Sequence, residues 1–234
     1  MIPCKTESVW RGISDCGHCS IREVALFADL KAEDFSTIHA PIDDLEFCQG
    51  TDLYREGGHA QGIFTLRTGM VKLVRSTHDG RPRIVRVLRP GDVIGLEALA
   101  GACYDSDAVA LTPVTVCRIP LDVIQQLAAT SPRLYAQLMN KWQHTLKDAG
   151  DWLADLNFGS ARQRVASLVL KMRSPDQQDV SMLFSREDMG AMLDLKFETV
   201  SREISRLVRE EVIAPLDKQG RAYRVCLPKR LSER

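Results

Sequence analysis

Between about residues 45 and 120, short apolar runs alternate with glycines and polar residues. Short runs that are rich in β-branched side chains and bounded by turn-forming residues predict antiparallel strands. The clearest runs lie at 62–66, 70–74, 84–88 and 114–119. The regular spacing of the turns between them predicts a β-roll or small barrel, with a hairpin tip at Asp79 and Gly80.

A different period begins at Ser131 and Pro132, which supply a helix N-cap and a proline suited to the first helical position. Apolar or small residues then follow at alternating steps of three and four, the spacing of a coiled-coil seam. The residues of this seam are Leu134, Leu138, Trp142, Thr145, Ala149, Trp152 and Leu156. A helix from 132 to about 157 would be roughly 39 Å long, too long for one side of a small barrel. We interpret the seam as the interface of a parallel homodimer, and the alternative is a helix packed on its own domain.

Helical periodicity returns after Gly159 in three shorter segments. The first follows a capping box at Ser160 and Gln163, and the second follows a similar signal at Ser185. The third begins near Phe197, after a tight break at 194–196. The inward positions expected for the three helices are Val165, Leu168, Val169 and Met172, then Met189, Met192 and Leu193, then Val200, Ile204, Leu207 and Val208. Two short helices joined by a tight turn, with a hairpin near 217–220 after them, predict a winged helix-turn-helix.

The predicted fold is therefore α+β with four parts. A cysteine-containing segment occupies 1–30, and an antiparallel β-roll of the cyclic-nucleotide-binding, jelly-roll type occupies 31–130. A dimerisation helix at 131–158 leads to a winged helix-turn-helix DNA-binding domain at 159–234.

Composition agrees with a soluble chain that has a substantial core. The 234 residues are 44% hydrophobic and their formal net charge is zero. From Phe158 to the end there are fifteen Lys and Arg and eleven Asp and Glu. The residues before Phe158 include sixteen Lys and Arg and twenty Asp and Glu. This excess favours a polyanionic partner for the C-terminal part. The start lacks the pattern of a signal peptide, and no apolar run approaches the roughly 20 residues that span a bilayer, so we expect a cytoplasmic protein without a membrane partner.

The outward face of the last helix has the chemistry of base recognition. Its residues are Glu198, Ser201, Arg202, Ser205 and Arg209. A carboxylate accepts from the cytosine amino group, a guanidinium donates two bonds to guanine, and a serine serves a base or a phosphate. Glu198 and Arg202 are four residues apart and can also brace each other, which on its own would describe an ordinary surface ion pair. Lys196, near the expected N-cap, has no side-chain acceptor, so this helix start is predicted to be weakly capped.

Two stretches carry a resemblance to a known family. The run from Phe197 to Arg202 contains Glu-x-x-Ser-Arg, and the roll contains Gly50, Leu53, Gly57, Gly69, Pro90, Gly91, Asp92, Ile119 and Pro120. Nearly the whole chain resembles the CRP/FNR bacterial transcription regulators, and within them the FNR and FixK branch.

The resemblance implies a homodimeric transcription activator that reads double-stranded DNA through Glu198, Ser201 and Arg202, at a palindrome of TTGAT-like half-sites. It also implies a link to oxygen or anaerobic metabolism and a contact of the hairpin near Asp79 with RNA polymerase. Arg81 departs from the acidic residue common there. The rival interpretation is a sensor of the same fold whose output is protein contact through metal or thiol chemistry. We find no phosphate-binding glycine loop, nucleophile motif or HExxH, so an enzyme is not expected.

Seven cysteines, an odd number spread over a long chain, indicate thiols or metal ligands rather than a disulfide framework. By resemblance, Cys16, Cys19 and Cys117 match three of the four ligands of an iron-sulfur cluster. The remaining ligand position, after Cys19, holds Ala25 or Phe27, depending on the branch. Three interpretations stay open: a cluster completed by Cys4 or His18, a thiol switch or zinc site, and a relic of a lost site. Three others lie in or beside apolar runs and are predicted to be small buried side chains: Cys48, Cys103 and Cys226.

The loop that would meet a cyclic phosphate is acidic. Glu97 is kept, but the stretch from Tyr104 through Asp105 and Ser106 to Asp107 offers two carboxylates and no arginine. Carboxylates repel a phosphate, so the sequence disfavours cyclic AMP as the ligand.

Overall fold

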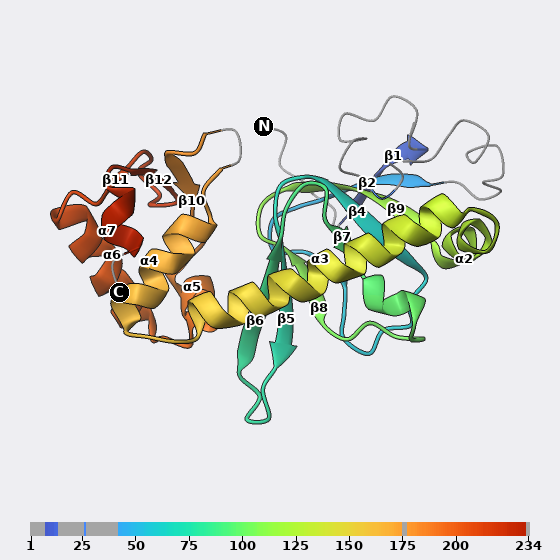
Figure 1. The fold of residues 1–234 in the computed structure, drawn as a ribbon, viewed down its shortest axis with the longest axis horizontal. Helices are drawn as coiled ribbons and strands as arrows, with labels where there is room; N and C mark the ends of the chain where they lie inside the picture. The colour runs from blue at the N-terminus through green and yellow to red at the C-terminus, as the bar shows by residue number, and fades with distance from the viewer. Residues whose placement is uncertain (1–7, 14–25, 27–41, 175–176, 233–234) are drawn as a thin grey trace. The chain divides into compact units, whose positions relative to one another are not determined.

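The computed structural model describes residues 8–13, 26, 42–174 and 177–232 (Figure 1). The chain divides into two compact units. The first comprises Met1–Gly80 and Val85–Lys147, and the second comprises Arg81–Ile84 and Asp148–Arg234. The mixed α and β architecture predicted from the sequence is confirmed.

Two antiparallel sheets form the roll of the first unit. The five-stranded sheet has the order β1-β2-β9-β4-β7, and the four-stranded sheet has the order β3-β8-β5-β6. The strand bounds are β1 Ser8–Ile13, β2 Asp43–Phe47, β3 Asp52–Tyr54, β4 Gly62–Thr68, β5 Val71–Ser76, β6 Pro82–Leu88, β7 Val93–Ile94, β8 Asp107–Ala110 and β9 Val114–Pro120. The four runs singled out in the sequence correspond to β4, β5, β6 and β9.

The hairpin between β5 and β6 has the turn that the sequence predicts. Gly80 has a φ of +77°, and its N–H donates to the carbonyl of Thr77 at 2.8 Å. Only glycine adopts this backbone conformation without strain, so the turn forms where the Asp-Gly pair stands.

Side chains from both sheets fill the inside of the roll. Ile63 and Leu66 on β4 and Val116 on β9 are completely buried, and β9 lies between β2 and β4. Each fully buried side chain of this size contributes roughly 1.5 to 3 kcal/mol relative to its exposed state. The periodic apolar positions of these strands therefore account for the core.

Helical segments complete the unit. The 3-10 helix η1 covers Leu96–Leu99, and α2 covers Leu121–Thr130 directly after β9. The buried side of α2 consists of Val123, Ile124 and Leu127, which belong to the core of the roll. Neither segment was predicted from the sequence.

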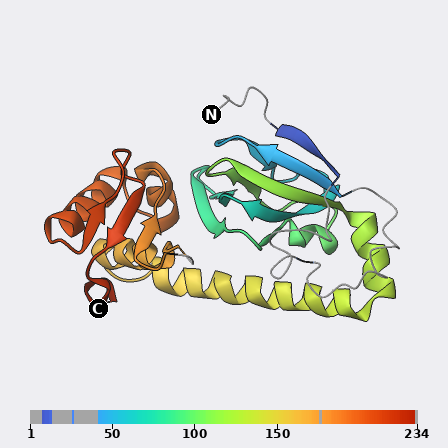
Figure 2. The same ribbon diagram turned by 90° about the horizontal axis from the view of Figure 1, so that it is seen from above.

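The long helix α3 spans Pro132–Leu156, within one residue of the predicted bounds. The Ser131 hydroxyl accepts from the N–H of Leu134 at 3.4 Å, which is the capping contact expected at this start. Figure 2 shows α3 leaving α2 after a sharp bend. Leu134 and Leu138 on its first turns belong to the core of the roll.

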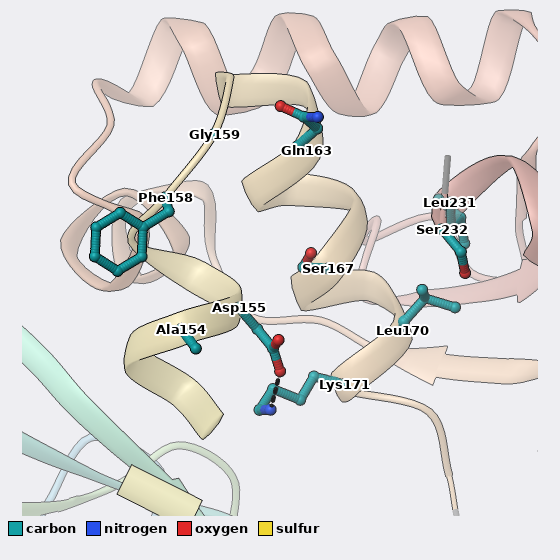
Figure 3. A pocket seen from close by; sticks show the side chains of 10 residues that line it. All are labelled: Ala154, Asp155, Phe158, Gly159, Gln163, Ser167, Leu170, Lys171, Leu231 and Ser232. Atoms are coloured by element: carbon teal, nitrogen blue, oxygen red, sulfur yellow. Dashed lines mark hydrogen bonds and ion pairs between the residues drawn. The ribbon is translucent and has the colours of Figure 1, made fainter. Parts of the chain in front are cut away.

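The junction between α3 and α4 (Ala161–Lys171) contains a glycine and a capping box. Gly159 has a φ of +88°, and the side chains of Ser160 and Gln163 satisfy each other's backbone N–H, as predicted. Beside the junction, an open groove of about 660 Å³ lies between the end of α3, α4 and the short helix α7 (Pro228–Ser232). Figure 3 shows the ion pair on its wall, in which Lys171 Nζ lies 2.6 Å from Asp155 Oδ2.

The remainder of the second unit is the predicted winged helix-turn-helix. Its elements after α4 are β10 Val180–Met182, α5 Arg186–Leu193, α6 Phe197–Arg209, β11 Ile213–Pro215, β12 Ala222–Val225 and α7 Pro228–Ser232. The three strands form an antiparallel sheet in the order β10-β12-β11. The short helix α7 was not predicted.

A close backbone approach defines the turn between α5 and α6. A Cβ on Gly190 would lie 2.6 Å from the carbonyl oxygen of Leu195, so no larger residue fits without a shift. Asp194 ends α5 with a φ of +53°, a conformation that aspartate tolerates better than most residues. The turn is therefore tight enough to fix the angle between the two helices.

The C-terminus of α6 is a Schellman motif with a non-glycine residue at its left-handed position. Val212 N–H donates to the Leu207 carbonyl and Glu211 N–H donates to the Val208 carbonyl, both at 3.0 Å. Glu211 has a φ of +56°. This position usually holds glycine, because a Cβ crowds the backbone there.

We therefore expect Glu211→Gly to raise the free energy of unfolding by about 1 kcal/mol, through relief of backbone strain. Urea unfolding followed by circular dichroism measures the change, with Glu211→Ala as the control, because alanine removes the charge but keeps the Cβ. Equal stabilisation by glycine and alanine would show that charge, rather than backbone strain, is responsible.

Candidate nucleic-acid interface

The helix α6 has one buried and one open face. Val200, Ile204 and Leu207 are buried against the rest of the unit. The five residues predicted to meet DNA lie away from that side: Glu198, Arg202, Ser205 and Arg209 are exposed and Ser201 is half-buried. The structure thus brings the five polar side chains to one accessible face.

The expected brace between Glu198 and Arg202 does not appear among the ion pairs of the described residues. Instead, Arg202 Nε lies 3.8 Å from Glu203 Oε1, at the limit of an ion pair, and the Arg202 side chain is 70% exposed. Glu203 is buried, and its second carboxylate oxygen has no hydrogen-bond partner. The guanidinium of Arg202 is therefore loosely held and accessible.

The N-terminus of α6 is uncapped by a side chain, as predicted. Lys196 occupies the N-cap and makes no side-chain hydrogen bond to the helix. The first backbone N–H groups of a helix carry a partial positive charge and lack intrahelical partners. In α6 these N–H groups belong to the same first turn as Glu198.

The hairpin of β11 and β12 forms the wing of the motif, and two sets of contacts hold it in place. Asp217 accepts from the backbone N–H of Arg221 at 3.0 Å and of Ala222 at 2.8 Å. These hydrogen bonds, the one from Arg221 first, lower the pKa of Asp217 below its usual value. The Arg186 guanidinium on α5 donates to the hydroxyl of Tyr223 on β12 at 2.7 Å, which fastens the wing to the first helix of the motif.

Two arginines on α4 fasten the ends of both helix-turn-helix helices. Arg164 donates to the carbonyl of Leu193, the last residue of α5, at 2.7 Å. Arg162 forms a two-pronged contact with Glu210, the C-cap of α6, and Arg206 donates to the same carboxylate at 2.9 Å. These contacts leave no periodic signal in the sequence and were not predicted, because the partners lie 48 and 29 positions apart.

The face of α3 predicted as the dimer seam is partly occupied by the chain itself. Leu134, Leu138 and Leu156 are 0%, 5% and 1% exposed, so their side chains are not available to a second copy. This corrects the predicted seam. Apolar side chains cover a wider arc of α3 than the rest of the chain buries. The side of this arc that carries Leu134, Leu138 and Leu156 packs inward.

The neighbouring part of the same arc is uncovered. Tyr135, Met139, Leu146 and Leu153 are 56%, 44%, 75% and 58% exposed. The spacing of seven residues from Met139 to Leu146 to Leu153 puts them in one line along the helix. We call these four residues the α3 stripe; Trp142 and Ala149 lie between it and the buried side.

Two tyrosine rings stack beside Glu97 inside the roll. The rings of Tyr54 and Tyr104 stack with centroids 3.7 Å apart, and the Tyr54 hydroxyl donates to Glu97 Oε1 at 3.2 Å. Burial, and then the neighbouring Asp105, raise the pKa of Glu97. The carboxylates of Glu97 and Asp105 would repel the phosphate of a nucleotide that bound beside them.

Only one of the proposed cluster ligands is described. Cys117 lies on β9, is 8% exposed, and pairs in register with Asp44 on β2 and Thr65 on β4. Cys4, Cys16 and Cys19 lie outside the described residues. Within the described part of the chain, no group of three or more His, Cys, Asp or Glu side chains could hold a metal ion.

The other three cysteines differ from the prediction. Cys103 and Cys226 are exposed free thiols, and Cys48 is disulfide-bonded. The interpretation of all three as small buried hydrophobic side chains is therefore wrong. One neighbour of each cysteine is buried, namely Phe47, Tyr104 and Val225, whereas the cysteines themselves lie at loop positions or strand ends, where the alternation no longer applies.

Comparison with known proteins agrees with both units. Residues 44–131 match the cyclic nucleotide-binding domain, and residues 163–234 match the Crp-like helix-turn-helix domain. In the described parts of the chain, no helix combines the length and apolarity needed to cross a bilayer.

Three similar proteins span most of the chain. The fumarate and nitrate reduction regulatory protein of Vibrio cholerae is 25% identical over 206 residues, covering 85% of this chain and 82% of its own length. The transcriptional activator protein Anr of Pseudomonas aeruginosa is 26% identical over 211 residues, covering 87% and 86%. The solved structure of FixK2 from Bradyrhizobium japonicum has a TM-score of 0.73 and 26% identity, covering 81% of this chain and 94% of that one.

Proposed function

Because the chain belongs to the CRP/FNR family of transcription regulators, we propose that it acts as a homodimer that reads a palindrome of TTGAT-like half-sites. The observation that carries this proposal is the open face of α6, where Glu198, Ser201 and Arg202 lie together at the start of the helix. In a helix-turn-helix, the N-terminal residues of the second helix meet base edges in the major groove.

Each of the three residues has a matching group on DNA. Arg202 donates two parallel bonds to one guanine, and Glu198 accepts from the amino group of a cytosine. Ser201 is short enough to allow close approach and can bond a base or a phosphate. The contact of Arg202 with Glu203 is long and the Arg202 side chain is mostly exposed, so this contact is easily exchanged for one with guanine.

The α3 stripe supports a dimer through a parallel α3 pair. Four large apolar side chains on one line of a helix expose a surface that water disfavours, and a second α3 carries the same line. Two-fold symmetry makes such a surface self-complementary. The stripe, together with Trp142 and Ala149, replaces the inward-facing leucines as the proposed interface.

The dimer explains why the site would be a palindrome. Two α6 helices related by a two-fold axis can read half-sites about 34 to 36 Å apart, one turn of DNA. Once one half-site is bound, the second contact forms within the same complex, so both contacts contribute to the binding free energy.

The names of the relatives support an activator of genes for anaerobic metabolism. One is a fumarate and nitrate reduction regulatory protein and another a transcriptional activator. Activation would involve contact with RNA polymerase, for which the exposed hairpin tip at Asp79, Gly80 and Arg81 is the proposed surface.

Fluorescence anisotropy with two duplexes tests the proposed reading of DNA. One carries a TTGAT-like palindrome and the other has the same composition with both half-sites scrambled. We expect the palindrome to bind about 10³-fold or more tightly than the scrambled duplex at physiological salt. Equal affinities for the two would refute sequence-specific reading.

A further inference from the structure

One arginine of α6 stands beside the open face but is tied to a carboxylate. Arg206 follows Arg202 by four residues and precedes Arg209 by three, so it lies on the flank of the face formed by those two. Its side chain is 54% exposed, and its Nε lies 2.9 Å from Glu210 Oε1. Its position would bring it near the sugar-phosphate backbone if α6 entered a major groove.

The carboxylate that ties Arg206 is itself fixed from the other side. Arg162 on α4 donates from both terminal nitrogens to the two oxygens of Glu210. The hydrogen bonds from Arg162 and then Arg206 hold the pKa of Glu210 below its usual value, so the group stays charged at neutral pH. A two-pronged contact of this kind fixes the direction of the carboxylate as well as its position.

The neighbouring pair on the same helix differs in strength. Arg202 Nε is 3.8 Å from Glu203, and its side chain is more exposed than that of Arg206. The helix therefore separates its cations into Arg202, which is free to leave its carboxylate, and Arg206, which is held.

We propose that Glu210 is a positioning residue that withholds Arg206 from the DNA backbone and so limits sequence-independent binding. The inference rests on the proposed function, because it assumes that α6 enters a major groove. A cation already paired with a carboxylate releases few counterions from DNA, and counterion release supplies most of the affinity for unrelated sequences. The carboxylate of Glu210 would also repel a phosphate that approached Arg206.

The test measures the salt dependence of binding to the scrambled duplex. Glu210→Gln removes the charge that holds Arg206 and keeps the shape of the side chain. If each subunit gains one phosphate contact, the slope of log affinity against log salt steepens by about 0.9 per subunit, or about 1.8 for a dimer. Between roughly 50 and 200 mM salt, the affinity of Glu210→Gln then falls about twelvefold more than that of the wild type.

Two further variants separate the local contact from folding and from net charge. Glu211→Gln makes the same change in charge at the next residue, for which the described residues show no ion pair, and is expected to leave the slope unchanged. Arg206→Gln alone is also expected to leave the slope unchanged, because the arginine is already withheld. The double variant Glu210→Gln with Arg206→Gln should return to the wild-type slope.

Several results would overturn the inference. Slopes that steepen equally for Glu210→Gln and Glu211→Gln would show an effect of net charge alone, and a wild-type slope for Glu210→Gln would show that Glu210 does not withhold Arg206 from DNA. A flatter slope for Arg206→Gln would show that this arginine already meets DNA, and this result overturns the inference even if Glu210→Gln fails to fold. A wild type that binds both duplexes equally would refute the proposed base reading, whereas the salt slopes would still decide the role of Glu210.

Discussion

A Leu146→Asp variant is expected to be monomeric and to bind the palindrome on the order of 10² to 10⁴-fold more weakly than the wild type. Leu146 is 75% exposed and is the most open residue of the α3 stripe. In a parallel α3 pair, two aspartates would face each other across an apolar seam, where burying an unpaired charge is costly. Without the dimer, each α6 helix binds its half-site alone.

The control for this variant is His144→Asp. His144 is also exposed, but two residues along a helix correspond to about 200°, so it lies on the other side of α3. We expect it to stay dimeric. Light scattering after gel filtration gives the mass, and anisotropy with the palindrome gives the affinity. A dimeric Leu146→Asp with unchanged affinity would place the interface elsewhere.

Arg202→Ala is expected to lower the affinity for the palindrome by about 1 to 3 kcal/mol per half-site, and so by about 2 to 6 kcal/mol in a dimer. The loss follows from removing two parallel hydrogen bonds to guanine. Preference for guanine at that position should disappear, whereas binding to the scrambled duplex should change little. Lysine does not replace the planar fork of arginine, so Arg202→Lys should recover only a small part of the discrimination.

Competition with palindromes that carry each of the four bases at the contacted position measures this effect. Arg206→Ala is the control on the same helix and is expected to keep the base preference, because it removes an arginine that is paired with Glu210 and does not belong to the five residues of the open face. The assignment of Arg202 fails if Arg202→Ala keeps the same base preference as the wild type.

The elements with a strong local pattern could be predicted from the sequence. The strands β4, β5, β6 and β9 and the helices α4, α5 and α6 each combine an apolar period with a turn or cap signal in neighbouring residues. The Ser160 capping box and the Gly80 turn are decided by residues within a few positions of each other. Local information was sufficient for these features.

The predicted dimer seam shows where a periodic pattern is ambiguous. The apolar positions of α3 fill an arc wide enough for two partners, and steps of three and four can be drawn along either part of it. The sequence does not say that the roll covers Leu134 and Leu138 while Met139 and Leu146 stay open. Only the fold of the roll decides which part of this arc near the start of α3 stays exposed.

The contacts around α6 depended on tertiary structure in the same way. The sequence suggested that Glu198 would pair with Arg202, because they are four apart on one helix. The structure instead places the strong ion pairs at Glu210, with Arg162 of another helix as one partner. A contact across 48 residues leaves no periodic signal, although the excess of arginine in the C-terminal part was visible.

The stacked rings of Tyr54 and Tyr104 also concern how members of this family diverged. In this roll two stacked aromatic rings take up the space beside Glu97, whereas a roll that admits an effector at that place needs smaller residues at one or both positions. We expect side-chain size at the positions of Tyr54 and Tyr104 to separate these two kinds of roll among genome sequences. The size of the side chains at these two positions would then indicate which regulators have room for an effector at this place in the roll.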